Sequence, residues 1–314
     1  MSCLIVNRYF IVSVIMKYLS VIALLFVIAA ATGQGRLERG EIVVDSLNRS
    51  FLVYVPAVDN VSKELPVVIS LHGGLSSGRQ MMNAADFRPV ADREKFIIVC
   101  PDGIDRGWND GRMNKERNDV KFIDALITYT VNKYNGDSLR VYATGISNGG
   151  FMATRLACEL NNKIAAIASV AGTMGKDVTY HPNKPVPVMY IHGTKDPLVP
   201  YNGGLNARTG AMVYSHEEIL KLWVAADGCS ETPVITNLPD SAGDGTSIIK
   251  EEYTNSTTGV KVIGYTVTNG GRTWPDGSQY LPRLIIGRVS HNMNACEVIW
   301  AFFKEYKLAD LTKH

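Results

Sequence analysis

The apolar positions of this chain follow two distinct patterns. Short, continuous apolar runs, typical of strands buried on both faces, occur at Leu65–Leu71, Phe96–Cys100, Ile164–Val170 and Val186–Ile191. Apolar residues recur at helical spacing in Asn118–Asn135, His216–Ala226 and Cys296–Tyr306.

Shorter strand patterns lie near both ends of the chain, at Glu41–Asp45, Ser50–Val55, Ile248–Tyr253 and Val260–Val267. Buried strands that alternate with helices predict an α/β protein, with a mostly parallel, doubly wound sheet flanked by helices. The sequence has no internal repeat and no linker, so we expect residues 34–314 to form a single domain.

The first 33 residues have a different pattern. An unbroken run of apolar and small residues covers Leu19–Ala31, after Lys17 and before Thr32-Gly33. This pattern predicts a secretory signal peptide cut near Gly33, and therefore a secreted or periplasmic protein. The alternative is an uncleaved membrane anchor, but Lys17 interrupts the apolar span, and the remaining run is shorter than the ~20 residues that cross a bilayer. Met1 and Met16 are both candidate start sites.

The charge balance and the cysteine spacing argue against some kinds of function. Without residues 1–33, which contain Arg8 and Lys17 but no acid, 30 basic residues stand against 30 acidic ones. No basic run stands out, so nucleic acid is a poor candidate partner. The four later cysteines (Cys100, Cys158, Cys229 and Cys296) match no metal-site spacing, and their pairing is open; Cys100 and Cys158 are expected to be free buried thiols. No metal or cofactor is predicted.

The strongest local signal is the segment VYATGISNGG (141–150), which contains Gly-x-Ser-x-Gly at Gly145, Ser147 and Gly149. A strand of β-branched and aromatic residues ends at Gly145, and a helical pattern begins near Gly149. Such a tight turn strains its central residue and requires neighbours without Cβ atoms. It would expose Ser147 Oγ as a nucleophile and direct the backbone N–H of Asn148 toward the same point, as half of an oxyanion hole.

Two other strand ends carry residues that would complete such a site. The strand ending at Leu71 is followed by His72, Gly73 and Gly74, and the N–H groups of these glycines would form the other half of the oxyanion hole. His72 itself is expected to fix this turn rather than to act as a base. Asp196 follows a later strand by one short loop, the position of an acid that orients a catalytic histidine. The alternative for Asp196 is a turn residue before proline.

Six segments together resemble one known family, the secreted polyhydroxybutyrate depolymerases and feruloyl esterases close to carbohydrate esterase family 1. They are LHGG (71–74), CPDGIDRGWNDGR (100–112), DVKFIDALI (119–127), RVYATGISNGGFMATRLACEL (140–160), IHGTKDPLVPYNGG (191–204) and GGRTWPDG (270–277). The resemblance implies an α/β-hydrolase fold and serine-dependent cleavage of carboxylic esters. It also implies Ser147 as nucleophile, Asp196 as orienting acid, and the amides of Gly73, Gly74 and Asn148 as oxyanion hole.

One position departs from this family. Its last segment usually reads Gly-Gly-His-Thr-Trp-Pro, with the histidine as general base, but this chain has Arg272 there. A guanidinium with a pKa above ~12 cannot accept the Ser147 proton. It could instead bind a carboxylate or another anion. His291, which precedes the last helix near Asn292 and Asn294, is the candidate substitute base; the alternative is an exposed residue beside a helix cap.

Two tryptophans, Trp108 and Trp274, lie in loops after strands and are candidate stacking surfaces for a sugar or an aromatic acyl group, or else buried loop anchors.

The sequence therefore predicts a secreted serine hydrolase that acts, through an acyl-enzyme on Ser147, on feruloyl or acetyl esters of plant polysaccharide or on short polyesters. The alternative is an impaired homologue that binds such ligands without turnover because of Arg272. A peptidase on the same fold is a third interpretation, which only the family segments oppose. The partner is a small or polysaccharide-linked ester, with no membrane association after signal cleavage, and the oligomeric state is open.

Overall fold

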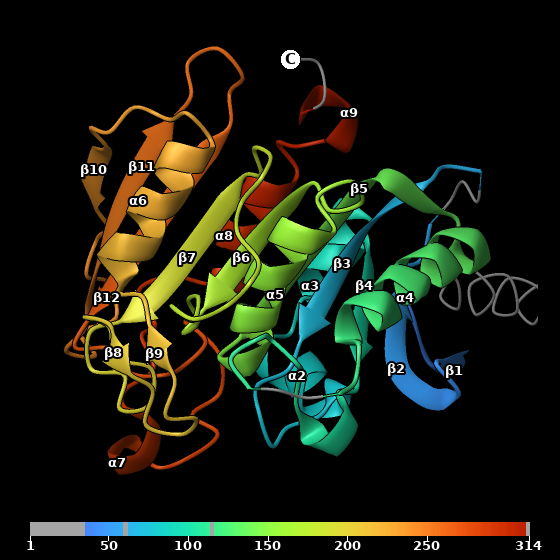
Figure 1. Cartoon of the computed structure of the whole chain (residues 1–314), viewed down its shortest axis with the longest axis horizontal. Helices are drawn as coiled ribbons and strands as arrows, with labels where there is room; N and C mark the ends of the chain where they lie inside the picture. The colour runs from blue at the N-terminus through green and yellow to red at the C-terminus, as the bar shows by residue number, and fades with distance from the viewer. Residues whose placement is uncertain (1–34, 59–61, 114–115, 312–314) are drawn as a thin grey trace, which may run out of the picture.

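A ten-stranded mixed sheet runs through the described part of the molecule (Figure 1). The computed structural model describes residues 35–58, 62–113 and 116–311, so the signal peptide predicted at residues 1–33 lies outside it. The sheet order is β1-β2-β4-β3-β5-β6-β7-β12-β11-β10. Its parallel centre consists of β3 (Leu65–Leu71), β4 (Ile97–Pro101), β5 (Gly136–Ile146), β6 (Ala166–Val170), β7 (Val188–Gly193) and β12 (Lys261–Thr268).

Antiparallel strands extend the sheet at both edges. They are β1 (Arg36–Val44) and β2 (Leu47–Val55) on one side, and β11 (Ser247–Thr254) and β10 (Val234–Asn237) on the other. A separate two-stranded ribbon pairs β8 (Gly204–Leu205) with β9 (Met212–Val213). The described sheet is thus mostly parallel in its centre, as the apolar runs predicted.

The helices cover the two faces of the sheet or lie in the loops beyond its strands. They are α2 (Gly78–Ala84), α3 (Arg88–Glu94), the 3₁₀ turn η1 (Ile104–Arg106), α4 (Asp119–Tyr134), α5 (Asn148–Glu159), α6 (His216–Ala226), α7 (Arg283–Ile286), α8 (Ala295–Phe303) and α9 (Leu308–Leu311). Local chemistry sets several of their ends. Asn118 caps α4 by accepting from the Lys121 N–H at 3.0 Å, and Ser215 and Glu218 form a capping box on α6.

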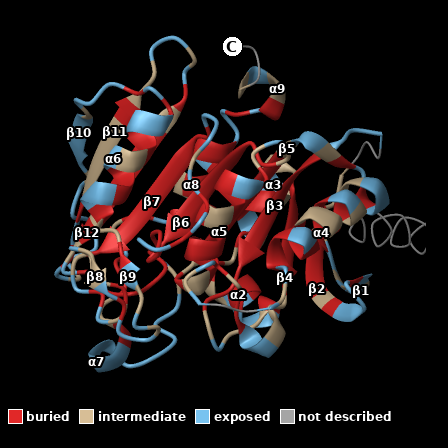
Figure 2. Ribbon diagram, in the orientation of Figure 1, coloured by how far each residue is buried: buried red, intermediate tan, exposed pale blue. Residues whose placement is uncertain are grey.

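Two hydrophobic cores cover the opposite faces of the sheet, because alternate strand residues point to opposite sides. One core joins Ile69 and Val141 with apolar residues of α4, α5 and α6. The other joins Val68 and Tyr142 with residues of α2, α3, α8 and α9. Figure 2 shows the result: the central strands are mostly buried, with exposed residues near the start of β5, whereas the helices alternate buried and exposed positions.

The predicted elements match closely at the centre and less well elsewhere. The strand at Leu65–Leu71 and the helix at His216–Ala226 have the predicted bounds, and the other predicted strands are present with shifted ends. The helices α2 and α3 and the short β8, β9 and β10 were not predicted. Cys100, Cys158, Cys229 and Cys296 are all free and buried, as expected for Cys100 and Cys158.

Among the described residues, no helix combines the length and apolar character needed to cross a bilayer.

Candidate active site

Ser147 occupies a strained turn between β5 and α5. Its backbone has φ 55° and ψ −119°, which a non-glycine residue rarely adopts, and its N–H donates to Val170 O at 2.8 Å. A Cβ at Gly149 would lie 2.1 Å from Leu71 O, and one at Gly145 would lie 2.6 Å from the Gly149 carbonyl carbon. The close approach of β3 to the start of α5 therefore requires both glycines.

Backbone N–H groups converge beside this serine. Those of Gly73, Gly74 and Asn148 donate to no acceptor within the described residues. A Cβ on Gly73 would lie 3.7 Å from Ser147 Cβ, so the turn after β3 lies against the serine. Free N–H groups at this point and at the start of α5 can donate hydrogen bonds to a carbonyl oxygen and stabilise the negative charge that develops on it.

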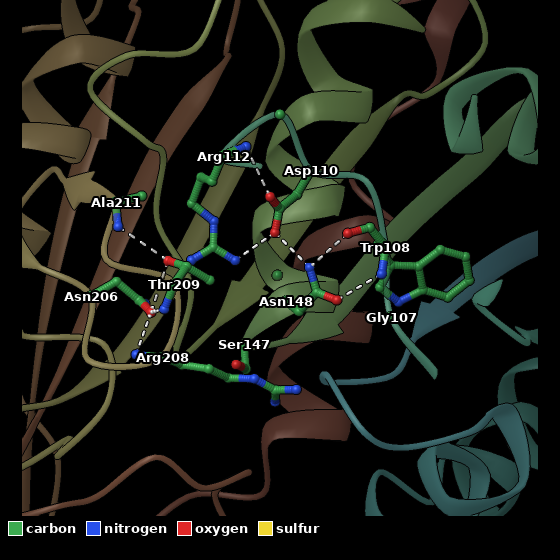
Figure 3. A network of polar contacts seen from close by, with 12 residues as sticks. Gly107, Trp108, Asp110, Arg112, Ser147, Asn148, Asn206, Arg208, Thr209 and Ala211 are labelled. Atoms are coloured by element: carbon green, nitrogen blue, oxygen red, sulfur yellow. Dashed lines mark hydrogen bonds and ion pairs between the residues drawn. The ribbon is translucent and has the colours of Figure 1, made fainter. Parts of the chain in front are cut away.

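The side chain of Asn148 connects the turn to the loop after β4 (Figure 3). Its Oδ1 accepts from the Trp108 N–H at 2.7 Å, and its Nδ2 donates to Asp110 Oδ2 at 2.5 Å. Asp110 also accepts from Arg112 at 2.5 Å, and the Arg112 guanidinium lies 3.4 Å over the Phe151 ring. This buried network fixes the loop wall beside Ser147.

His72 holds the turn after β3, the role expected of it. Its Nε2 accepts from the Gly103 N–H at 2.9 Å, so its Nδ1 is the protonated nitrogen and donates to Gly73 O at 2.7 Å. Burial lowers the pKa of His72, which keeps the ring neutral.

Asp196 is a buried carboxylate at the end of β7. Its Oδ1 accepts from the N–H groups of Leu198 and Val199, at 2.8 and 2.9 Å. Its Oδ2 has no hydrogen-bond partner within the described residues, and His192 Nε2 lies 3.5 Å from it. A buried acceptor without a donor is unusual, and it is the feature expected where an acid should receive an N–H from a catalytic histidine.

Arg272 stands at the position where the resemblance implies that histidine. It follows β12 in a segment fixed by its own N–H to Ile286 O, at 2.6 Å, and by the Tyr280 hydroxyl on its carbonyl oxygen at 3.0 Å. Its Nε donates to Ser147 Oγ at 2.9 Å, and its Nη2 donates to the same oxygen. The guanidinium therefore binds the nucleophile as a donor and leaves Oγ without a proton acceptor.

His291 is placed away from these groups. Its side chain is 53% exposed, its Nδ1 lies 3.1 Å from Asp276 Oδ1, and its N–H donates to Asp244 at 2.6 Å. It makes no hydrogen bond to Ser147 or Asp196. The structure therefore matches the alternative of an exposed residue near the cap of α8, and its role as base remains a prediction without geometric support.

The two candidate tryptophans differ. Trp108 is fully buried, and its Nε1 donates to His72 O at 2.8 Å, so it anchors a loop. Trp274 packs against Phe87 with ring centroids 6.0 Å apart and also lines a cavity at Ser147. Trp108 lines the other cavity at Ser147, so each tryptophan borders one of the two.

Arg208 is a site residue that sequence reasoning missed. It lies between β8 and β9, and Figure 3 shows its side chain extending beside Ser147. Its Nη1 lies 2.7 Å from the position that a Cβ of Gly74 would take. Burial and the charges of Arg272 and Arg112 lower its pKa. No motif marks this residue, because only the path of its loop brings it to the serine.

Two cavities open at Ser147. The smaller, of about 200 Å³, lies against Asn148 and the loop after β4. The larger, of about 730 Å³, has a largely apolar wall. Its apolar lining comprises Leu75, Met81, Ala84, Ala85, Ile146, Leu198, Trp274, Tyr280 and Leu281.

Comparisons with known proteins indicate the class of protein that this chain resembles. Residues 109–212 match the model of a family described as Phospholipase/Carboxylesterase. The chain is 28% identical over 274 residues to NocK, a proposed esterase of Nocardia uniformis subsp. tsuyamanensis, covering 82% of this chain and 79% of that protein. It is 29% identical over 240 residues to feruloyl esterase B of Piromyces equi, covering 73% of this chain but only 43% of that protein.

Among solved structures, an acetyl xylan esterase from Aspergillus awamori has a similar fold, with a TM-score of 0.54 at 15% identity, over 75% of this chain and 94% of that one. The protein therefore has the α/β-hydrolase fold, as the resemblance implied. Its family match and its relatives are those of carboxylesterase-type hydrolases, consistent with an α/β-hydrolase esterase family.

Proposed function

We propose that this protein is a secreted serine carboxylic ester hydrolase that acts through an acyl-enzyme on Ser147. Its substrates would be feruloyl or acetyl esters of plant polysaccharide, or short polyesters. Relatedness to a protein named feruloyl esterase B supports the ester class, although the chain spans less than half of that relative. Export rests on the sequence of residues 1–33, and N-terminal sequencing of the exported protein, with cleavage expected near Gly33, would test it.

The strained Ser147 turn, with free N–H groups beside it, is the observation that carries this proposal. In the reaction, Ser147 Oγ would attack the ester carbonyl carbon, and the N–H groups of Gly74 and Asn148 would hold the oxyanion. The alcohol would leave, and water would then release the acid from the serine. Both steps require a group that removes a proton from the attacking oxygen.

Binding without turnover is the second candidate, and the Arg272 contact favours it. A guanidinium that donates twice to Ser147 Oγ cannot take its proton, and within the described residues no histidine donates a hydrogen bond to Asp196 Oδ2. Loss of one triad member leaves a small residual rate from the oxyanion hole and substrate binding.

Hydrolysis of p-nitrophenyl acetate by the wild type and by Arg272→His separates the two candidates. If the wild type lacks a base, the histidine variant should raise kcat/KM by at least about 100-fold, because an imidazole at residue 272 could lie between Ser147 and Asp196. Arg272→Gln is the matched control, since it removes the guanidinium without supplying a base. Ser147→Ala should abolish the activity of every variant.

The opposite result is equally informative. A wild type that turns over as fast as Arg272→His, and loses all activity with Ser147→Ala, contradicts binding without turnover and requires a base elsewhere. His291→Gln would then show whether that base is His291. Labelling by a fluorophosphonate gives an independent readout, because it needs an activated Ser147 but no ester specificity.

A further inference from the structure

Two guanidinium groups at the Ser147 cavities have no anionic partner in the described part of the chain. Arg272 is 8% exposed, and its only side-chain acceptor there is the neutral hydroxyl of Ser147. The Arg208 guanidinium makes no hydrogen bond or ion pair within the described residues. Burying an unpaired charge is costly, so Arg272 gains much from an anionic partner. Arg208 is exposed, and its guanidinium adds positive charge beside Gly74.

The neighbouring charged residues do not neutralise the positive charges of Arg208 and Arg272. Arg112 is paired with Asp110 at 2.5 Å, and both are almost fully buried. The 730 Å³ cavity is lined by Arg208 and Arg272 and by no acidic residue. Its end at Ser147 is therefore positive, and Gly73 and Gly74, whose N–H groups donate to no acceptor within the described residues, line the same cavity.

The donors suit a carboxylate. A guanidinium carries five N–H donors, and Arg272 uses only those on Nε and Nη2 for Ser147. Arginine and backbone N–H groups bind carboxylates through charge-assisted hydrogen bonds that are stronger than those to a neutral carbonyl. A carboxylate at Ser147 would thus gain interactions that an uncharged ester cannot make.

The rest of the cavity suits an apolar body. Its wall includes Met81, Ile146, Trp274 and Leu281, and its volume lies in the range of small-molecule sites. Inorganic anions would fill only the positive end and leave this wall in contact with water.

We infer that the cavity binds a monocarboxylic acid with an aryl or alkyl body, the carboxylate held by Arg272 and Arg208 beside Ser147. The inference deepens the proposed function, since such an acid is the acyl product of the proposed ester. It requires the same cavity but no turnover. The Arg272 guanidinium then makes the cavity bind the free acid more tightly than the uncharged ester.

Isothermal titration with trans-cinnamate and with cinnamamide, its neutral and esterase-resistant counterpart, tests this inference. The wild type should bind cinnamate at least about tenfold more tightly than cinnamamide and than acetate. Arg272→Gln and Arg208→Gln should each weaken cinnamate binding about tenfold and leave cinnamamide binding within about twofold. Arg272→Lys keeps the charge and should keep part of the preference, and Arg93→Gln, at a surface ion pair, should change nothing.

Three results would overturn the inference. Equal affinity for cinnamate and cinnamamide would show that the charges do not select the ligand. A preference that survives both glutamine variants would place the anion elsewhere, and acetate binding as tightly as cinnamate would exclude the apolar wall. The p-nitrophenyl acetate assay is independent of these: acid preference without turnover removes only the hydrolase proposal, and turnover without acid preference removes only this inference.

Discussion

His216 is a polar residue enclosed in an apolar environment. It begins α6, is fully buried, and neither ring nitrogen has a hydrogen-bond partner in the described part of the chain. Its ring stacks on Tyr201 with centroids 5.1 Å apart, and His192 lies edge-on at 6.0 Å. Burial, together with the nearby His192, lowers the pKa of His216 to about 3. The folded state therefore holds this ring neutral at pH values where the unfolded chain would protonate it.

Replacing His216 by Phe should reduce the pH dependence of stability. The folded pKa is depressed, so below pH ~6.5 the unfolded state binds a proton that the folded state does not, and stability falls as pH falls toward 3. Protonation of His216 in the unfolded chain therefore makes the free energy of unfolding about 2 kcal/mol lower at pH 5 than at pH 7.5. Urea unfolding at pH 7.5 and at pH 5 measures this effect. On acidification, the free energy of unfolding of His216→Phe should fall by about 2 kcal/mol less than that of the wild type. The exposed His181→Gln should follow the wild type, and identical losses in wild type and His216→Phe would contradict the prediction.

At the scale of elements, β3, β5 and α5 meet at one tight contact that sets the position of Ser147. The start of α5 lies directly on the end of β3, close enough that a Cβ at Gly149 would be 2.1 Å from Leu71 O and 2.7 Å from His72 O. Backbone atoms cannot move away as a side chain can. The serine turn therefore requires a residue without a Cβ atom at position 149.

Gly149→Ala should destabilise the protein by about 3 kcal/mol or more and displace the serine turn, because overpacking against backbone forces a shift of α5. Gly73→Ala is a matched control in the same site, since its Cβ would lie at 3.4 Å from Ile146 O, an ordinary contact. Thermal unfolding and fluorophosphonate labelling, in the Arg272→His background if the wild type does not label, would check both effects. Equal stability of the two variants would show that this contact can relax.

The sequence predicted elements whose pattern is local and missed those defined by packing. Continuous apolar runs mark β3 and β6 because both faces of these strands are buried. The helix α2 gives no such signal: it is seven residues long, begins with Gly78, and places Met81 and Met82 together. Arg208 reaches Ser147 by a loop, which no local spacing encodes. The motif at residues 270–277, in contrast, singled out Arg272, and the structure shows its guanidinium donating to Ser147 Oγ.

At the scale of the whole molecule, one buried carboxylate connects the sheet edge to the site. Asp119, at the first position of α4, is completely buried. Its Oδ1 accepts from Arg49 of β2 at 2.7 Å, and its Oδ2 accepts from the Asn109 N–H at 2.6 Å and from Arg117 at 3.1 Å. Residue 109 follows Trp108 in the loop that binds Asn148. The outer strands and the site loop thus share one anchor.

Asp119→Asn should therefore weaken both the fold and the site. Removing the carboxylate leaves Arg49, which is 3% exposed, as a buried cation without its partner, at a cost of about 3–5 kcal/mol. Chemical unfolding should show a loss of this size. Cinnamate binding, measured where the variant is still folded, should fall as well, because the loop after β4 loses its support and no longer holds Asn148, the neighbour of Ser147 at the binding cavity. The exposed pair Glu217–Lys221 supplies the control: Glu217→Gln should cost below about 1 kcal/mol and leave binding intact. A loss of stability without loss of binding would show that the site loop is held by Asn148 alone.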